Sequence, residues 1–139
     1  MDTKKFLIST ITGGIVYFLL GFLVYALLLD SFFESHSGTA TGVEKTIEMQ
    51  YWPLFVGNLA QAALLSYVFI KWAHIKTFSA GFSAGFIIGF LMTLGHYLIQ
   101  YDTTNIMDLT GTIAEVAVYS IMTAIVGGVV GAVIGMGSK

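Results

Sequence analysis

The strongest constraint in this sequence is a set of four long apolar stretches that occupy most of its length. They cover residues 6–29, 52–72, 78–100 and 109–136. A helix needs about 20 mostly apolar residues to cross the hydrocarbon core of a bilayer, and each stretch meets that length. The apolar residues run continuously, whereas a membrane strand alternates them with polar ones over about 10 residues. The sequence therefore predicts an all-α integral membrane protein, a single domain at residues 1–139 with four spanning helices packed as a bundle.

Charged residues are too few for a surface that faces water. They make up 10% of the chain, against about a quarter in soluble domains. A net charge of −2 without any arginine offers no surface for phosphate groups, which argues against nucleic acid as a partner. The sequence also contains no cysteine, so disulfides and cysteine-ligated metals are excluded. The expected surroundings of this chain are the lipid bilayer.

The six lysines predict which way the chain crosses the membrane. Four spans put both termini on one side, and that side carries every lysine except Lys45. Lysine-rich ends and loops stay in the cytoplasm, so both termini are expected there, with residues 73–77 as a basic cytoplasmic turn. Residues 30–51 then form an acidic outer loop and residues 101–108 a short outer loop. Within the longer loop, residues 43–50 alternate charged and apolar side chains and are expected to form a short helix at the membrane surface.

Glycines recur every four residues in the third and fourth apolar stretches. The members of these two ladders are Gly81, Gly85, Gly89, Gly127, Gly131 and Gly135. Glycines at this spacing share one helix face and leave room for a second backbone, which is how many helices pack in lipid. Both ladders fall in the cytoplasmic half, so the third and fourth helices are expected to pack closely there. Contacts between copies of the chain are an alternative use of the same glycines, and the two uses are compatible.

Five polar side chains within the outer half of the spans form the candidate ligand- or ion-binding site. They are Glu115 of the fourth stretch, His96 of the third, Asn58 and Gln61 of the second, and Tyr25 of the first. At about 1.5 Å per residue, the first four lie roughly 6 to 14 Å inside the outer helix ends. They are therefore expected to share one layer, to which all four helices contribute.

Glu115 is the most informative of the five. A carboxylate inside a span costs a few kcal/mol unless it is paired, hydrated or protonated, so it is expected to face the bundle interior. One interpretation is a polar crevice, open outward, that binds a proton, a cation or a small polar ligand. The other is a structural hydrogen-bond cluster in which Glu115 is neutral or paired to His96. The sequence leaves both interpretations open.

Asp30, Glu34 and His36 form a second polar group, where the chain leaves the first span. Carboxylates and imidazole suit Zn²⁺ or another divalent ion, but no second histidine lies nearby and the following residues are rich in Ser, Gly and Thr. A solvated acidic loop is the expected outcome, so no metal site is predicted. The sequence carries no recognisable catalytic or nucleotide-binding motif. We therefore expect neither catalytic residues nor a cofactor.

Short patterns of glycine and aromatic residues occur along nearly the whole chain. They are Gly13-Gly14, Gly21 with Tyr25, Gly57-Asn58-Leu59 after Trp52, Lys71-Trp72-Ala73, Gly89-Phe90-Leu91-Met92, Thr104-Asn105, and Gly127-Gly128 with Gly131. In these patterns the chain resembles uncharacterised small four-helix bacterial inner-membrane proteins, a domain-of-unknown-function family. The resemblance implies a bacterial plasma membrane and one domain, and it implies no activity. Small multidrug transporters also have four helices, but they place their essential acid in the first helix, where this chain has none.

Taken as a whole, the sequence favours a non-enzymatic function. We expect a small binding or accessory subunit that works beside a larger membrane protein or as a homo-oligomer. The alternative is a small transporter or channel for a proton, a cation or a small polar ligand, with Glu115 as its ionisable residue and His96, Asn58 and Gln61 along the path. An enzyme is least expected, because no nucleophile lies beside a base.

Overall fold

The structure, a computed structural model, describes residues 2–42 and 50–136, and within them the chain is helical apart from short connections. The elements in chain order are α1 (Thr3–Gly21), η1 (Phe22–Leu28), α2 (Asp30–Ser35), α3 (Trp52–Tyr67), η2 (Val68–Ala73), α4 (Phe78–Thr103) and α5 (Leu109–Met136). The segments η1 and η2 continue α1 and α3 with π-helical hydrogen bonding. Four helices are thus long and apolar enough to cross a membrane, which confirms the predicted fold class.

The helix boundaries differ from the predicted ones by a few residues. The four spans are Thr3–Leu28, Trp52–Ala73, Phe78–Thr103 and Leu109–Met136. The first begins earlier than the apolar pattern because Asp2 caps it, its side chain accepting a hydrogen bond from the Lys5 N–H at 3.2 Å. Thr77 caps α4 in the same way through the N–H of Ala80. Each cap satisfies a backbone donor that the first helical turn leaves free.

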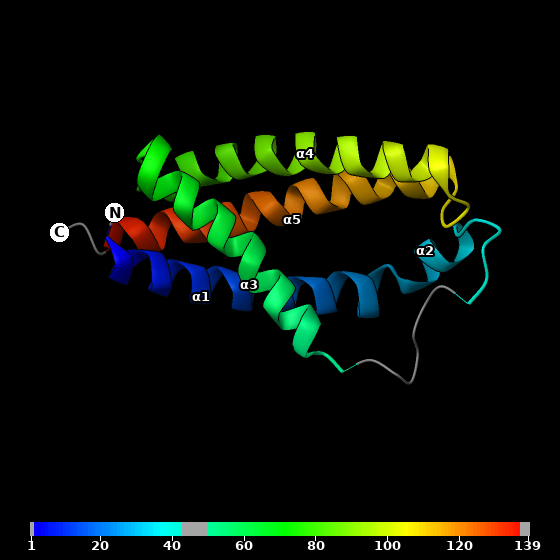
Figure 1. Cartoon of the computed structure of the whole chain (residues 1–139), viewed down its shortest axis with the longest axis horizontal. Coiled ribbons are helices and arrows are strands. Elements are labelled where there is room, and N and C mark those ends of the chain that lie inside the picture. Colours follow the sequence, from blue (N-terminus) through cyan, green and yellow to red (C-terminus); the bar gives the residue numbers. More distant parts are fainter. Residues whose placement is uncertain (1, 43–49, 137–139) are drawn as a thin grey trace.

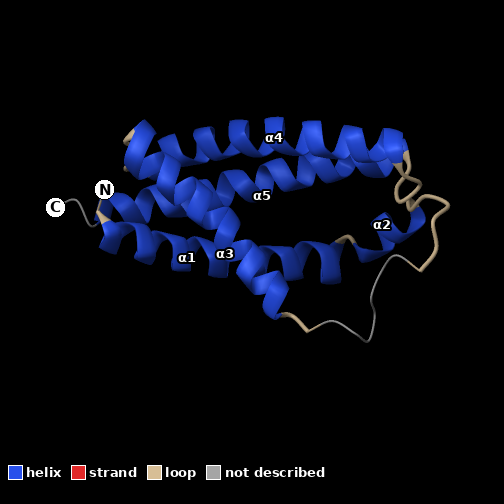
Figure 2. Ribbon diagram, viewed as in Figure 1, coloured by secondary structure: helices blue, strands red, loops and turns tan. Residues whose placement is uncertain are grey.

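Helix α5 is the centre of the bundle (Figure 1). It packs against α4 on one side and α1 on the other, while α3 crosses α1 diagonally. Figure 2 shows the same arrangement, in which α3 begins about midway along the bundle, whereas the other connections lie at the two ends of the long helices. The start of α1 and the end of α5 lie together at one end, which we call the terminal end, and α2 with its adjoining loops lies at the other, the loop end.

Helices α4 and α5 approach so closely that glycine is needed at their interface. A Cβ atom on Gly81 would overlap the carbonyl oxygen of Gly127, and one on Gly131 would overlap the carbonyl oxygen of Thr77. On Gly89 it would lie 2.7 Å from the Cβ of Thr123. The glycines of the two ladders thus lie between α4 and α5, except that Gly135 meets Lys76 of the turn before α4. Only residues without a side chain let two helix backbones come this near.

A second close contact joins α1 to α3 and α5, again through glycine. A Cβ on Gly13 would lie 2.7 Å from Val130, and one on Gly14 would lie 2.5 Å from Leu59. The four-residue glycine spacing that predicts helix packing does not include this Gly-Gly pair. The apolar core beside it comprises Tyr17, Ala62, Leu65, Phe69, Met122, Val126, Val130 and Ile134. Most of this core lies toward the terminal end, so that half of the bundle is filled by apolar side chains.

The loop end contains a helix that the sequence reading did not predict. The sequence predicts a loop over residues 30–51, but Asp30–Ser35 is the short helix α2. Beyond it the chain pairs with the other loop: Gly38 N–H donates to Ile106 at 2.8 Å, and Ser37 and Met107 form an isolated antiparallel bridge. The surface helix predicted at residues 43–50 falls almost wholly outside the described residues.

Candidate functional site

The candidate site is built around Glu115, which lies six residues after the start of α5. This side chain is only 7% exposed. The Tyr25 hydroxyl of η1 donates a hydrogen bond to its Oε1 atom. Glu115 thus points into the bundle toward α1 and η1, and its partner is Tyr25 rather than His96. A carboxylate buried in this way, with one neutral donor, keeps most of its charge uncompensated.

Two further hydrogen bonds continue from Glu115 along α5. Tyr119 and Thr123 follow at intervals of four residues, which places all three on one helix face. The Tyr119 hydroxyl donates to Gln61 of α3, and the Tyr17 hydroxyl of α1 donates to Thr123 at 2.7 Å. The Tyr17 and Tyr119 rings also stack, with centroids 6.1 Å apart. We call this row of three contacts the polar seam.

The structure does not bring all five predicted site residues together. Asn58 donates to the Leu54 carbonyl of its own helix at 2.9 Å. It lines a hollow of about 480 Å³ between α1, η1 and α3, which Tyr25 and Gln61 also line. His96 is exposed, and its ring lies nearly perpendicular to the Tyr97 ring, with the centroids 5.1 Å apart. Tyr25, Gln61 and Glu115 therefore belong to the polar seam, whereas Asn58 and His96 lie beside it.

A crevice at the loop end reaches Glu115 from outside the bundle. It encloses about 440 Å³ and is lined by Tyr25, Ala26, Asp30, Phe33, Glu34, Met107 and Glu115. We call it the outer crevice. Two of its acids, Asp30 and Glu34, come from one face of α2, since they are four residues apart. Its aromatic wall is made by Tyr25 and Phe33, whose ring centroids lie 5.6 Å apart. Carboxylates and aromatic faces both attract cations.

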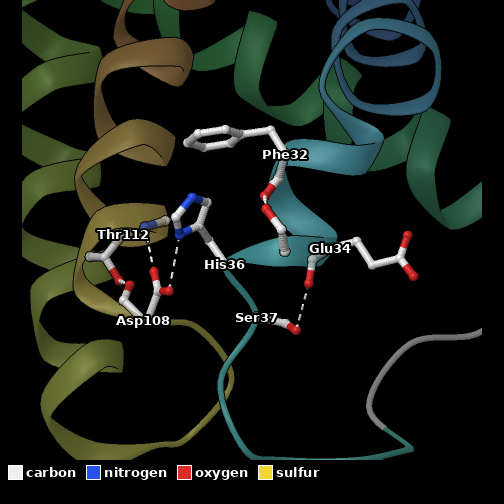
Figure 3. Close-up of polar contacts among 8 residues, drawn as sticks. Phe32, Glu34, His36, Ser37, Asp108 and Thr112 are labelled. Atoms are coloured by element: carbon white, nitrogen blue, oxygen red, sulfur yellow. Dashed lines mark hydrogen bonds and ion pairs between the residues drawn. The ribbon is translucent and has the colours of Figure 1, made fainter.

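The other predicted polar group comprises Asp30, Glu34 and His36. The two acids lie on α2 and line the outer crevice, whereas His36 follows the end of α2 and has a different partner. The His36 ring points toward Asp108 rather than toward Glu34 (Figure 3), and its Nδ1 lies 3.0 Å from Oδ2 of Asp108. The Asp108 N–H in turn donates to the His36 carbonyl at 2.9 Å. Among the residues that the structure describes, no three His or acidic side chains gather as metal ligands. His36 thus joins the two loops, and the sequence reading missed Asp108 as its partner.

Asp108 also begins α5. Its Oδ1 accepts from the Gly111 N–H at 2.7 Å. This backbone hydrogen bond, and then His36, hold the pKa of the Asp108 carboxyl below its ordinary value. The signal was present in the sequence, because an aspartate just before an apolar run is typical of a helix start. Its pairing with His36 had no such signal, since the two residues are 72 positions apart.

Toward the terminal end, below the polar seam, buried apolar side chains replace the polar ones. Leu65, Phe69, Val126 and Val130 are almost completely buried there. The close backbone contacts of Gly127 and Gly131 with α4 and Thr77 lie beside Val126 and Val130 on α5. The tightly packed half of the bundle therefore lies beyond the polar seam, on the side away from the outer crevice.

Comparisons with protein-family models, with curated proteins and with solved structures give no match for this chain.

Proposed function

We propose that this chain is a non-enzymatic binding or accessory protein of a bacterial inner membrane that takes a small cation into the outer crevice. The observation that carries the proposal is the burial of Glu115 at the floor of an acidic crevice. A carboxylate at this depth is stabilised by binding a proton or a cation, because the Tyr25 hydroxyl supplies no charge. The multi-pass membrane character rests on the four spanning helices.

The shape of the crevice favours an organic cation over a bare metal ion. Its volume of about 440 Å³ falls within the range of small-molecule sites. Tyr25 and Phe33 give it an aromatic wall, and ammonium groups bind over aromatic faces. Asp30 and Glu34 at the mouth raise the local cation concentration. A protonated amine or a quaternary ammonium ion therefore fits the crevice best, and a proton takes its place when no cation is bound.

The test is a binding measurement with a series of ammonium ions, from methylammonium to tetraethylammonium, on the chain in lipid nanodiscs. Glu115→Gln removes the charge and keeps the shape, so we expect the Kd of the tightest ion to rise at least about tenfold, equivalent to about 1.4 kcal/mol. Asp102→Asn is the matched control, because Asp102 is an acid of the loop end that does not line the crevice. Unchanged affinity in Glu115→Gln, with its fold intact, would contradict the proposal.

The same variants separate a binding protein from the transporter alternative. In sealed liposomes, a binding or accessory protein takes up the ion without moving it across the membrane, as the packed apolar half of the bundle suggests. Ion accumulation that Glu115→Gln abolishes would instead favour a transporter. The accessory function further predicts that a partner membrane protein, or a second copy of the chain, co-purifies in mild detergent. A monomer without any partner would count against it.

The proposed orientation places the terminal end in the cytoplasm, because all four lysines of residues 2–42 and 50–136 lie there. Since the chain lacks cysteine, single cysteines can be introduced and labelled in intact cells. A membrane-impermeant maleimide is expected to label Asn105→Cys, between α4 and α5, and to leave Lys76→Cys, between η2 and α4, unlabelled. The reverse pattern would invert the topology and put the outer crevice on the cytoplasmic face.

A further inference from the structure

A second hollow opens to the side of the bundle, between α3 and α4. It encloses about 330 Å³, and its lining includes Gln61, Leu64, Ile88, Met92, Thr93 and His96. We call it the side groove. It exists because α3 packs mainly on α1 and α4 mainly on α5. The two helices are therefore near each other where they join and diverge toward the other end of α3 (Figure 1). In a membrane such a wedge faces the lipid.

Polar side chains line this groove at a depth where lipid offers them no partner. His96 lies seven residues before the end of α4, and Gln61 nine residues after the start of α3. At about 1.5 Å per residue they lie roughly 10 and 14 Å from those ends along their own helices, inside segments that are long and apolar enough to cross a membrane. Uncovered polar groups in hydrocarbon cost free energy, so something polar is expected to cover them.

Their hydrogen-bonding capacity is only partly used. Gln61 accepts from Tyr119 through its oxygen, which leaves its two amide N–H donors available. His96 forms no hydrogen bond within residues 2–42 and 50–136, so its donor and acceptor nitrogens are both available. Thr93, by contrast, donates to the Gly89 carbonyl of its own helix. The groove thus offers mainly donors, from Gln61 and His96, to a ligand.

The remaining lining decides what kind of ligand fits. No Asp, Glu, Lys or Arg lines the groove, so a phosphate or ammonium headgroup would be buried there without a counter-charge, at high cost. The side chains of Leu64, Ile88 and Met92 give it apolar walls. The volume of about 330 Å³ suits one headgroup, whereas an entire helix from a partner is far wider.

We infer that the side groove binds a neutral amphiphile, a lipid-soluble molecule with a carbonyl or hydroxyl head and a long apolar tail. The head oxygen accepts from His96 and Gln61, and the tail leaves the groove between α3 and α4 into the bilayer. Isoprenoid quinones and diacylglycerol share this chemistry. The site is separate from the outer crevice, and this inference stands independently of the proposed cation binding.

The test uses photoactivatable analogues of a quinone and of diacylglycerol, each applied to the chain in nanodiscs and competed with the unlabelled compound. Saturable cross-links are expected on the part of α4 that contains Met92 and His96, with at least one analogue. Comparing the quinone analogue with the diacylglycerol analogue shows which class of lipid binds. Binding of both supports a site that recognises only the head oxygen. If neither analogue gives saturable labelling, the inference is overturned.

Matched variants locate the binding. His96→Leu combined with Gln61→Leu removes both donors, and we expect at least a tenfold loss of affinity, whereas Asn58→Leu, a polar residue of α3 outside the groove, leaves it within twofold. If the double variant fails to fold, Met92→Trp fills the groove and tests the same point without touching a polar group. Unchanged affinity in folded variants would overturn the inference. The inference would also be overturned if the chain bound no ligand and the groove variants changed from dimer to monomer. The groove would then be an interface between copies of the chain.

Discussion

The terminal half and the loop half of the bundle are held together in different ways. In the terminal half, α4 and α5 meet backbone to backbone at glycine, and apolar side chains such as Phe69 and Val130 fill the space between α1, α3 and α5. In the loop half, tyrosine hydroxyls bridge the helices, and three hollows lie between them. The buried carboxylate and the outer crevice thus lie in the half that tyrosine hydrogen bonds hold together, away from the glycine contacts.

The same contrast separates α5 from α4. In the most apolar 18-residue stretch of each helix, 56% of the residues are buried in α5 but only 17% in α4. A polar residue on the central helix is therefore enclosed by protein, as Glu115 is, whereas His96 on the peripheral helix is exposed. Two polar residues at comparable depth thus meet different surroundings, one facing an acidic crevice and the other a groove that faces lipid.

The largest expected effect comes from breaking the packed half. Gly127→Leu places a side chain against the backbone of α4 at Gly81, where no rotamer can relieve the overlap, so we expect a loss of about 3 kcal/mol in unfolding free energy. Gly95→Leu is the matched control, because nothing lies within 4 Å of a Cβ at that position of α4. Thermal unfolding in detergent measures both. Equal stability of the two variants would mean that close approach does not hold the terminal half together.

A smaller effect distinguishes hydrogen bonds in the two halves. Tyr25→Phe removes the donor to Glu115 and is expected to cost about 1–3 kcal/mol and to change cation affinity. Ser66→Ala removes a buried hydrogen bond to Ser9, 2.9 Å long, between α1 and α3. We expect it to cost about 1 kcal/mol without changing affinity. Ammonium binding that responds equally to both variants would remove the distinction between a structural half and a binding half.

The smallest effect concerns the junction of the two loops. The lowered pKa of Asp108 means that its ionised form stabilises the folded chain above the ordinary carboxyl pKa of 3.8. This stability is lost as the pH falls through the lower, folded-state pKa. Asp108→Asn keeps the helix cap and removes the charge. We therefore expect the variant to lack one component of the acid sensitivity between about pH 5 and 2, measured as hydrogen exchange at Gly111. Identical pH profiles would show that the charge does not matter.

Much of the fold followed from local pattern, and the partners within the site did not. The four spans were predictable because each carries its own signal, a long apolar run. The pairing of Glu115 with Tyr25 was not, since those residues are 90 positions apart and periodicity says only which face each occupies. Helix α2 was missed because Asp30–Ser35 is six residues long, too short for a periodic pattern to emerge.

By itself, the sequence determined that the chain suits a lipid bilayer, that it forms four long helices, and that glycine recurs regularly on two of them. These are properties of single segments, and lipid enforces them because a spanning backbone must satisfy its own hydrogen bonds. Only the tertiary structure decided that α5 is central, that Glu115 meets Tyr25 beneath the acids of α2, and that His96 faces a separate groove. Those outcomes depend on which helix packs on which, and in lipid that choice rests on the close fit between surfaces, which one sequence does not display.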